Sequence, residues 1–166
     1  MTYPTDGPDA DLGTIARDLR LDHVQRPGCP INAVKSRLRE TGLRPTRQRV
    51  LLAWMLFGKG NRHVSAEELF EQATRARAHL SLATVYNTLR QFTDAGLLRL
   101  VQSGPGKAYF DTNVHDHHHF VVDGEDTVMD VPANTLAVSG MPAAPPGFAI
   151  AGIDVIVRLK RLDGAS

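Results

Sequence analysis

Apolar positions recur every three or four residues between residues 31 and 95, which is the period of amphipathic helices. Start and stop signals divide this stretch. Ser65 and Glu68 have the spacing of a capping box, Ser81 can cap the last segment, and glycines follow the segment ends. Pro45 is expected in the first turn of the second helix, where a backbone N–H has no partner to lose. The pattern predicts four helices, which begin near Ile31, Pro45, Ser65 and Leu82.

After Gly96 the pattern becomes that of strands. Residues 97–102 and 107–112 are expected to pair around a Ser-Gly-Pro-Gly turn. Further strands are expected over residues 118–122, 127–131 and 149–159, the last after a Pro-rich connection. Helices followed by a hairpin are the order of a winged helix-turn-helix, whose last helix enters the DNA major groove. The expected fold class is therefore α+β, with an N-terminal winged helix-turn-helix DNA-binding domain followed by a small α/β dimerisation domain.

Three parts of the chain are expected on this basis. Residues 1–30 are polar and contain four prolines, so we expect a mobile extension with at most a short helical turn over residues 14–21. Residues 31–112 form the winged-helix domain, and residues 113–166 form the second domain. A second domain of about 55 residues is too small to cover both faces of its sheet, which predicts a homodimer.

The charge distribution agrees with the predicted DNA-binding domain. The 166-residue chain has 19 Lys and Arg residues against 18 Asp and Glu residues, so its formal net charge is only +1. That total combines −2 over residues 1–30, +8 over residues 31–110 and −5 over residues 111–166. A basic segment of this kind is typical of a nucleic-acid-binding module. The single cysteine excludes an internal disulfide. The absence of a secretory signal and of a long apolar run predicts a cytoplasmic protein without a membrane span.

The helix that begins at Leu82 carries side chains suited to reading DNA. With Val85 and Leu89 toward the core, polar residues occupy the outer positions. Asn87 can pair bidentately with adenine and Tyr86 can pack on a thymine methyl, whereas hydroxyl and guanidinium groups can hold phosphates. An ordinary amphipathic surface helix is the alternative. The residues predicted to contact DNA are Arg44, Arg47, Ser81, Thr84, Tyr86, Asn87, Arg90 and Lys107.

Four of the seven histidines lie within residues 115–119. On a strand, His117 and His119 would share one face and converge on an ion, with His118 on the other face. Asp111 could add a carboxylate oxygen, and His63 could join from the winged-helix domain. The alternative for such a run of histidines is a solvated loop.

Cys29 lies between a glycine and a proline. A thiolate is a good axial ligand for ferric haem, and imidazoles are also haem ligands. The alternative for a single cysteine in a mobile segment is an ordinary free thiol. The candidate haem ligands are Cys29, His117, His118 and His119.

Four segments of the chain form a recognisable set: Gly42-Leu43-Arg44-Pro45-Thr46-Arg47-Gln48-Arg49, His63-Val64-Ser65-Ala66-Glu67-Glu68-Leu69, Leu82-Ala83-Thr84-Val85-Tyr86 and Asp94-Ala95-Gly96. In order and spacing, these segments resemble the ferric uptake regulator superfamily. The resemblance covers about residues 31–160. Within the superfamily the chain is most similar to the iron response regulators. That similarity rests on the triple histidine and on residues 109–113, 140–142 and 155–159.

This resemblance implies a homodimeric winged-helix transcription factor, not an enzyme, that represses or activates iron and haem genes at pseudo-palindromic operators in double-stranded DNA. It implies a regulatory site for Fe²⁺, Mn²⁺ or Zn²⁺ at His63, Asp111, His117 and His119. It also implies that haem is the signal, bound at Cys29 and the histidine cluster.

The chain departs from the family pattern in four places. The Cys-x-x-Cys pairs of many members are absent, so no structural zinc held by four cysteines is expected, and the usual C-terminal histidine ligand is missing. Asn87 stands where much of the superfamily has Arg, which implies a different operator. Ile31 and Asn32 follow the Cys-Pro pair, where haem motifs of this type often have an aromatic residue and a histidine.

Two other classes of function remain open from the sequence. The first is a metal- or haem-buffering protein whose basic segment is incidental. The second is a metalloenzyme that uses the histidine cluster for hydrolysis, which would need an open coordination position and a nearby general base. The chain contains no H-E-x-x-H motif, which argues against the second.

Overall fold

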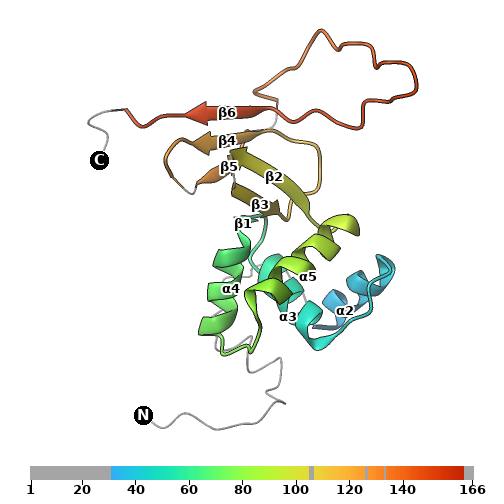
Figure 1. Ribbon diagram of the computed structural model, residues 1–166, viewed down its shortest axis with the longest axis vertical. Helices are drawn as coiled ribbons and strands as arrows, with labels where there is room; N and C mark the ends of the chain where they lie inside the picture. The colour runs from blue at the N-terminus through green and yellow to red at the C-terminus, as the bar shows by residue number, and fades with distance from the viewer. Residues whose placement is uncertain (1–30, 105–106, 126, 133, 163–166) are drawn as a thin grey trace. The chain divides into compact units, whose positions relative to one another are not determined.

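The structure, a computed structural model, describes residues 31–104, 107–125, 127–132 and 134–162 (Figure 1). These residues fall into two compact units. One, here called the helical unit, contains residues 31–102 and 107–114, and the other, the C-terminal unit, contains residues 103–104 and 115–162. The expected N-terminal extension, its helical turn and Cys29 lie outside the described residues. No helix in the described ranges is long and apolar enough to cross a bilayer.

Four helices build the helical unit: α2 (Ile31–Glu40), α3 (Arg47–Phe57), α4 (Ala66–Arg75) and α5 (Leu82–Asp94). The predicted caps of α4 and α5 are confirmed. Ser65 Oγ accepts the Glu68 N–H at 3.1 Å while Glu68 Oε2 accepts the Ser65 N–H at 2.8 Å, and Ser81 Oγ accepts the Thr84 N–H at 3.1 Å. These bonds satisfy backbone donors that the first turn of a helix leaves without partners.

The start of α3 differs from the prediction. Thr46 is the N-cap, with an extended backbone and a hydroxyl that accepts the Arg49 N–H at 3.4 Å. Pro45 therefore lies just before the cap and not in the first turn. Thr46 takes the position because its side chain offers an oxygen to an orphan N–H, which Pro45 cannot do.

The helices enclose a continuous apolar core. Val85 and Leu89, which were expected to face inward from α5, are fully buried. With Phe92 of the same helix they pack in one cluster with Leu52 of α3 and Leu69 of α4. The position of α5 is therefore fixed by the apolar side of the helix, which leaves its polar side exposed.

A three-stranded sheet completes the helical unit, in the order β1-β3-β2. Its strands are β1 (His63–Val64), β2 (Arg99–Gly104) and β3 (Lys107–Asp111). β1 was not predicted, because two residues are too short for a recognisable alternation. β2 begins two residues later than predicted. The Leu97 N–H bonds back to the Phe92 carbonyl at 2.8 Å and so belongs to the end of α5.

The C-terminal unit has a second three-stranded sheet, in the order β5-β4-β6. β4 (His119–Val122) pairs antiparallel with β5 (Val128–Asp130) and parallel with β6 (Ile156–Leu159). The predicted strand over residues 149–159 was wrong for residues 149–155. β4 supplies only four partners to β6, from His119 opposite Ile156 to Val122 opposite Leu159, so an apolar sequence before them forms no ladder.

Candidate metal centre and DNA surface

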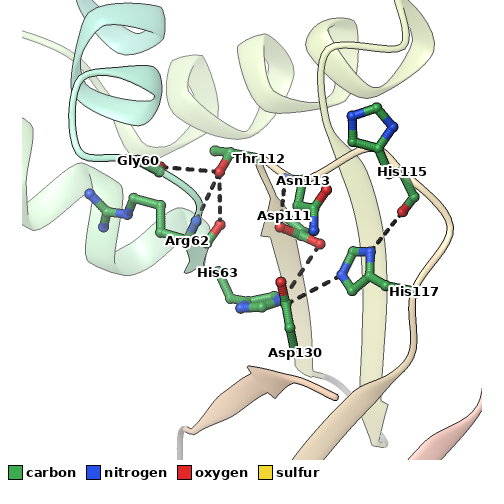
Figure 2. Close-up of polar contacts among 9 residues, drawn as sticks. All are labelled: Gly60, Arg62, His63, Asp111, Thr112, Asn113, His115, His117 and Asp130. Carbon is green, nitrogen blue, oxygen red and sulfur yellow. Dashed lines mark hydrogen bonds and ion pairs between the residues drawn. The ribbon is translucent and has the colours of Figure 1, made fainter. Parts of the chain in front are cut away.

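Two potential metal ligands meet in the first sheet of the helical unit. His63 on β1 is the register partner of Asp111 on β3, and His63 Nε2 lies 3.5 Å from Asp111 Oδ2 (Figure 2). Asp111 is completely buried, and its Oδ1 accepts the Asn113 N–H at 2.8 Å. Next to this pair, Thr112 Oγ1 accepts the Arg62 N–H at 2.9 Å and the Thr112 N–H donates to the Arg62 carbonyl at 3.1 Å. Strand pairing thus brings together two of the predicted ligands that are 48 positions apart in sequence.

Three potential ligands meet in the C-terminal unit. His119, the first residue of β4, is buried and lies opposite Asp130 of β5, and His117 Nε2 lies 3.3 Å from Asp130 Oδ1 (Figure 2). The His117 and His119 rings meet edge to face with centroids 4.4 Å apart. One potential ligand atom from each of the three residues lies within 4.8 Å of the others. This is the distance scale on which side chains share one ion.

The hydrogen bond of His117 selects the ring nitrogen that can bind metal. Its Nδ1 lies 2.7 Å from the His115 carbonyl oxygen, which can only accept, so Nδ1 carries the proton (Figure 2). The Nε2 lone pair is then available to an ion. Bonding of the second ring nitrogen to a carbonyl is the usual way in which proteins orient a histidine ligand.

The predicted convergence of His117 and His119 has a different origin from the one expected. His117 precedes β4, so the two residues do not alternate along one strand. His118 is engaged elsewhere, because its Nδ1 accepts the Val155 N–H at 3.4 Å and its carbonyl accepts the Val131 N–H at 2.8 Å. It therefore joins the start of β4 to the segments beside it.

Sequence reasoning missed Asp130. Its signal was present, since Asp130 lies in the predicted strand over residues 127–131 and could have been placed opposite His119 by pairing that strand with its neighbour. Imidazole nitrogen and carboxylate oxygen are together the donor set that Fe²⁺, Mn²⁺ and Zn²⁺ accept in proteins. The described residues therefore provide two such groups, His63 with Asp111, and His117 and His119 with Asp130.

The exposed side of α5 carries the residues predicted to read DNA. Tyr86, Asn87 and Arg90 are exposed, whereas Thr84 is half-buried and its hydroxyl lies 2.9 Å from that of Ser81. Arg44 and Arg47 are exposed at the start of α3. Lys107 lies on β3, but its side chain is outside what the structure describes.

Arg49 and Glu67, which were not among the predicted site residues, contact this surface. Arg49 of α3 donates through Nε to Gln91 Oε1 of α5 at 3.0 Å and through Nη1 to the Arg44 carbonyl at 2.9 Å, so it joins the start of α3 to α5. The Tyr86 hydroxyl donates to Glu67 Oε1 of α4 at 3.3 Å. Partial desolvation, and then the charge and hydrogen bond of Glu67, raise the pKa of the Tyr86 phenol.

The sequence profile of the ferric uptake regulator family matches residues 40–155. The chain belongs to this family. It is 31% identical over 93 residues to the peroxide-responsive repressor PerR of Staphylococcus aureus strain Mu50, and the match covers 56% of this chain and 62% of that protein. The same identity and coverage hold for that repressor in strain USA300. The chain thus matches less than two thirds of the length of these relatives.

Solved structures of the family confirm the α+β fold class. The chain is similar to the ferric uptake regulator of Pseudomonas aeruginosa with manganese, with a TM-score of 0.59 and 27% identity over 77% of this chain and 97% of that one. It also shares the fold of the Vibrio cholerae ferric uptake regulator, with a TM-score of 0.58 and 21% identity over 76% of this chain and 98% of that one.

Proposed function

We propose that this chain is a homodimeric, metal-responsive transcriptional regulator that binds double-stranded DNA through α5. The observation that carries the proposal is that a helix with a polar, exposed side occurs in the same chain as two incomplete groups of metal ligands. Membership of the ferric uptake regulator family supports it and counts against a metalloenzyme. The exposed Tyr86, Asn87 and Arg90 on one side of α5 support DNA binding over a buffering role.

The regulatory metal is proposed to take ligands from both groups. His63 and Asp111 offer two donor atoms, and His117, His119 and Asp130 offer three, whereas Zn²⁺ takes four ligands and ions such as Mn²⁺ take up to six. Neither group is a full coordination shell by itself. An ion bound by both would restrain the helical and C-terminal units relative to each other. In a dimer, this would set the spacing of the two recognition helices.

A second copy of the chain is proposed to bind at the C-terminal unit. Within the described part of this unit, Val121 and Val131 are the only apolar side chains that are buried. Phe148 is 77% exposed, and four other apolar side chains between residues 136 and 150 are also exposed: Leu136, Val138, Met141 and Ile150. So few buried side chains cannot offset the entropy of ordering this unit, and a partner that covers the apolar residues would complete it.

Iron is the proposed physiological signal, as an ion at the five His and Asp ligands or as haem. The ion is favoured by the described residues, because His119 is buried within the ligand group and His118 already accepts a backbone N–H. Haem binding through Cys29 and His117 to His119 rests on the similarity to iron response regulators. A peroxide response is a second candidate, favoured by the relatives that are named peroxide-responsive repressors.

DNA selection with the full chain tests the proposal. Metal-free protein with and without added Mn²⁺ is used to enrich random double-stranded DNA, and gel shifts then compare the enriched duplex with a scrambled one. We expect selective, Mn²⁺-dependent retardation that Asp130→Asn removes and that Asp123→Asn, a substitution at an exposed carboxylate of the same unit, leaves intact. Failure to enrich any sequence under either condition contradicts the proposal.

The same samples distinguish the proposed signals. Haem added to wild type and to Cys29→Ala reports whether the thiolate contributes to the spectrum and whether haem releases the duplex. Hydrogen peroxide added to protein loaded with Fe²⁺ should abolish retardation only if the peroxide response is correct.

A further inference from the structure

Glu67 places a negative charge beside the side of α5 that is proposed to bind DNA. It lies in the first turn of α4, is exposed, and its Oε1 accepts the Tyr86 hydroxyl at 3.3 Å. Tyr86 shares the exposed side of α5 with Asn87 and Arg90. A carboxylate at this position is unexpected, because DNA phosphates repel it.

The cap of α4 does not explain Glu67. The capping box is completed by Glu68, whose carboxylate accepts the Ser65 N–H. Among the described residues, Glu67 forms no ion pair with an arginine or lysine, whereas Glu71, one turn further along α4, pairs with Arg75 at 3.1 Å. Its one polar side-chain contact in the described part of the chain is the phenol of Tyr86.

That contact restricts the orientation of the Tyr86 ring. An exposed tyrosine otherwise samples several rotamers, and ordering it on binding opposes association. With its hydroxyl held by Glu67, the ring is already oriented before DNA arrives. Partial desolvation raises the pKa of the Tyr86 phenol most, and the charge and hydrogen bond of Glu67 raise it further.

We propose that Glu67 is a specificity-determining residue of the DNA surface, which positions Tyr86 for a base contact and repels phosphates when that contact is absent. The inference rests on the proposed DNA-binding function and deepens it. On the correct sequence the base contact of Tyr86 offsets the repulsion. On other DNA the repulsion remains, so the affinity for non-specific duplex is lowered more than the affinity for the operator.

The test uses three substitutions in the full chain and the duplex enriched by wild-type protein. Glu67→Ala removes both the acceptor and the charge, Glu67→Gln keeps an acceptor without the charge, and Tyr86→Phe keeps the ring without the hydroxyl. Glu71→Gln is the matched control on the same helix. Dissociation constants are measured for the enriched and the scrambled duplex at several salt concentrations, together with the helix content of each variant.

Glu67→Ala is expected to lower the ratio of specific to non-specific affinity by about threefold to tenfold, the range of one exposed hydrogen bond. Glu67→Gln is expected to raise the affinity for the scrambled duplex and to lower the ratio less than Glu67→Ala does. Glu71→Gln should leave the ratio unchanged. In a Tyr86→Phe background there is no hydroxyl for Glu67 to hold, so Glu67→Ala and Glu67→Gln differ only in an acceptor that has no donor. The two double variants should therefore have the same ratio of specific to non-specific affinity.

Two results would overturn the inference. One is equal changes in both affinities for Glu67→Ala, which would indicate a general charge effect. The other is an undiminished difference between Glu67→Ala and Glu67→Gln after the Tyr86 hydroxyl has been removed. Either result leaves the proposed function standing, whereas failure of wild type to enrich any duplex contradicts the proposed function itself.

Discussion

Asp111→Asn tests the proposed metal centre at its most deeply buried ligand candidate. The Asp111 side chain is completely buried, and a buried carboxylate costs several kcal/mol unless positive charge or hydrogen bonds compensate it. Asparagine has nearly the same shape and can still accept the Asn113 N–H that lies 2.8 Å from Oδ1. Because shape and this acceptor are kept, we expect the variant without metal to fold and to lose no more than about 2 kcal/mol of stability, at the low end of what core substitutions cost.

With metal bound, wild type is expected to be clearly more stable than Asp111→Asn. Wild type in Mn²⁺ at 100 times its dissociation constant gains about 2.7 kcal/mol of stability. Losses of about 100-fold in metal affinity follow even from changes beside a ligand, so loss of a charged ligand should reduce the gain at the same Mn²⁺ concentration to about 0.4 kcal/mol or less. For a chain of this size, 1 kcal/mol corresponds to about 2–4 °C in Tm. The Mn²⁺-induced rise should be about 5–11 °C for wild type and below about 2 °C for the variant.

Thermal unfolding followed by circular dichroism, in chelator and in Mn²⁺, measures both quantities. Asp94→Asn, at an exposed carboxylate of α5, is the control and should keep the full rise. If the free energy of unfolding of the variant in chelator is more than about 2 kcal/mol below that of wild type, Asp111 stabilises the fold, chiefly through His63. An unchanged Mn²⁺-induced rise would remove Asp111 from the ligand set.

Three further predictions concern local contacts. Ser65→Ala removes one of the two capping-box bonds and should cost about 1 kcal/mol in urea unfolding, whereas Ser36→Ala, exposed within α2, should cost nothing; equal costs would contradict the role of the cap. Tyr86 should titrate above its ordinary pKa of 10.0 in an ultraviolet difference titration against Tyr86→Phe, because its neutral form is favoured in the folded state. Its contribution to stability is then present below pH 10 and lost as the pH rises through the folded pKa, and a titration at or below 10.0 would refute the Glu67 contact. Phe148→Ser should leave the monomer as stable as before and shift sedimentation toward monomer, and an unchanged dimer would place the interface elsewhere.

Local signals in the sequence predicted the helical unit well, and pairing between distant strands limited the rest. The caps at Ser65 and Ser81 could be read directly, because a cap involves residues three positions apart. Asp130 was missed as a ligand candidate, because its place opposite His119 emerges only when the two predicted strands are paired in the correct register. The segment over residues 149–155 has an apolar, β-branched pattern but belongs to no strand ladder in the described part of the chain, because propensity alone does not provide a neighbouring strand. Glu67 was missed for the same reason, because its partner on α5 is 19 positions away.

The helical unit and the C-terminal unit differ in the number of apolar side chains that each buries. α5 rests on a continuous buried core, so the side of the helix that is proposed to bind DNA is held in place without any ligand. The C-terminal unit has two buried apolar side chains in its described part, together with three of the five candidate ligands. At the proposed metal site, the free energy of binding would therefore act chiefly on the C-terminal unit, which buries fewer apolar side chains. Regulation of the proposed kind would change the geometry and population of the proposed dimer and would leave α5 as it is.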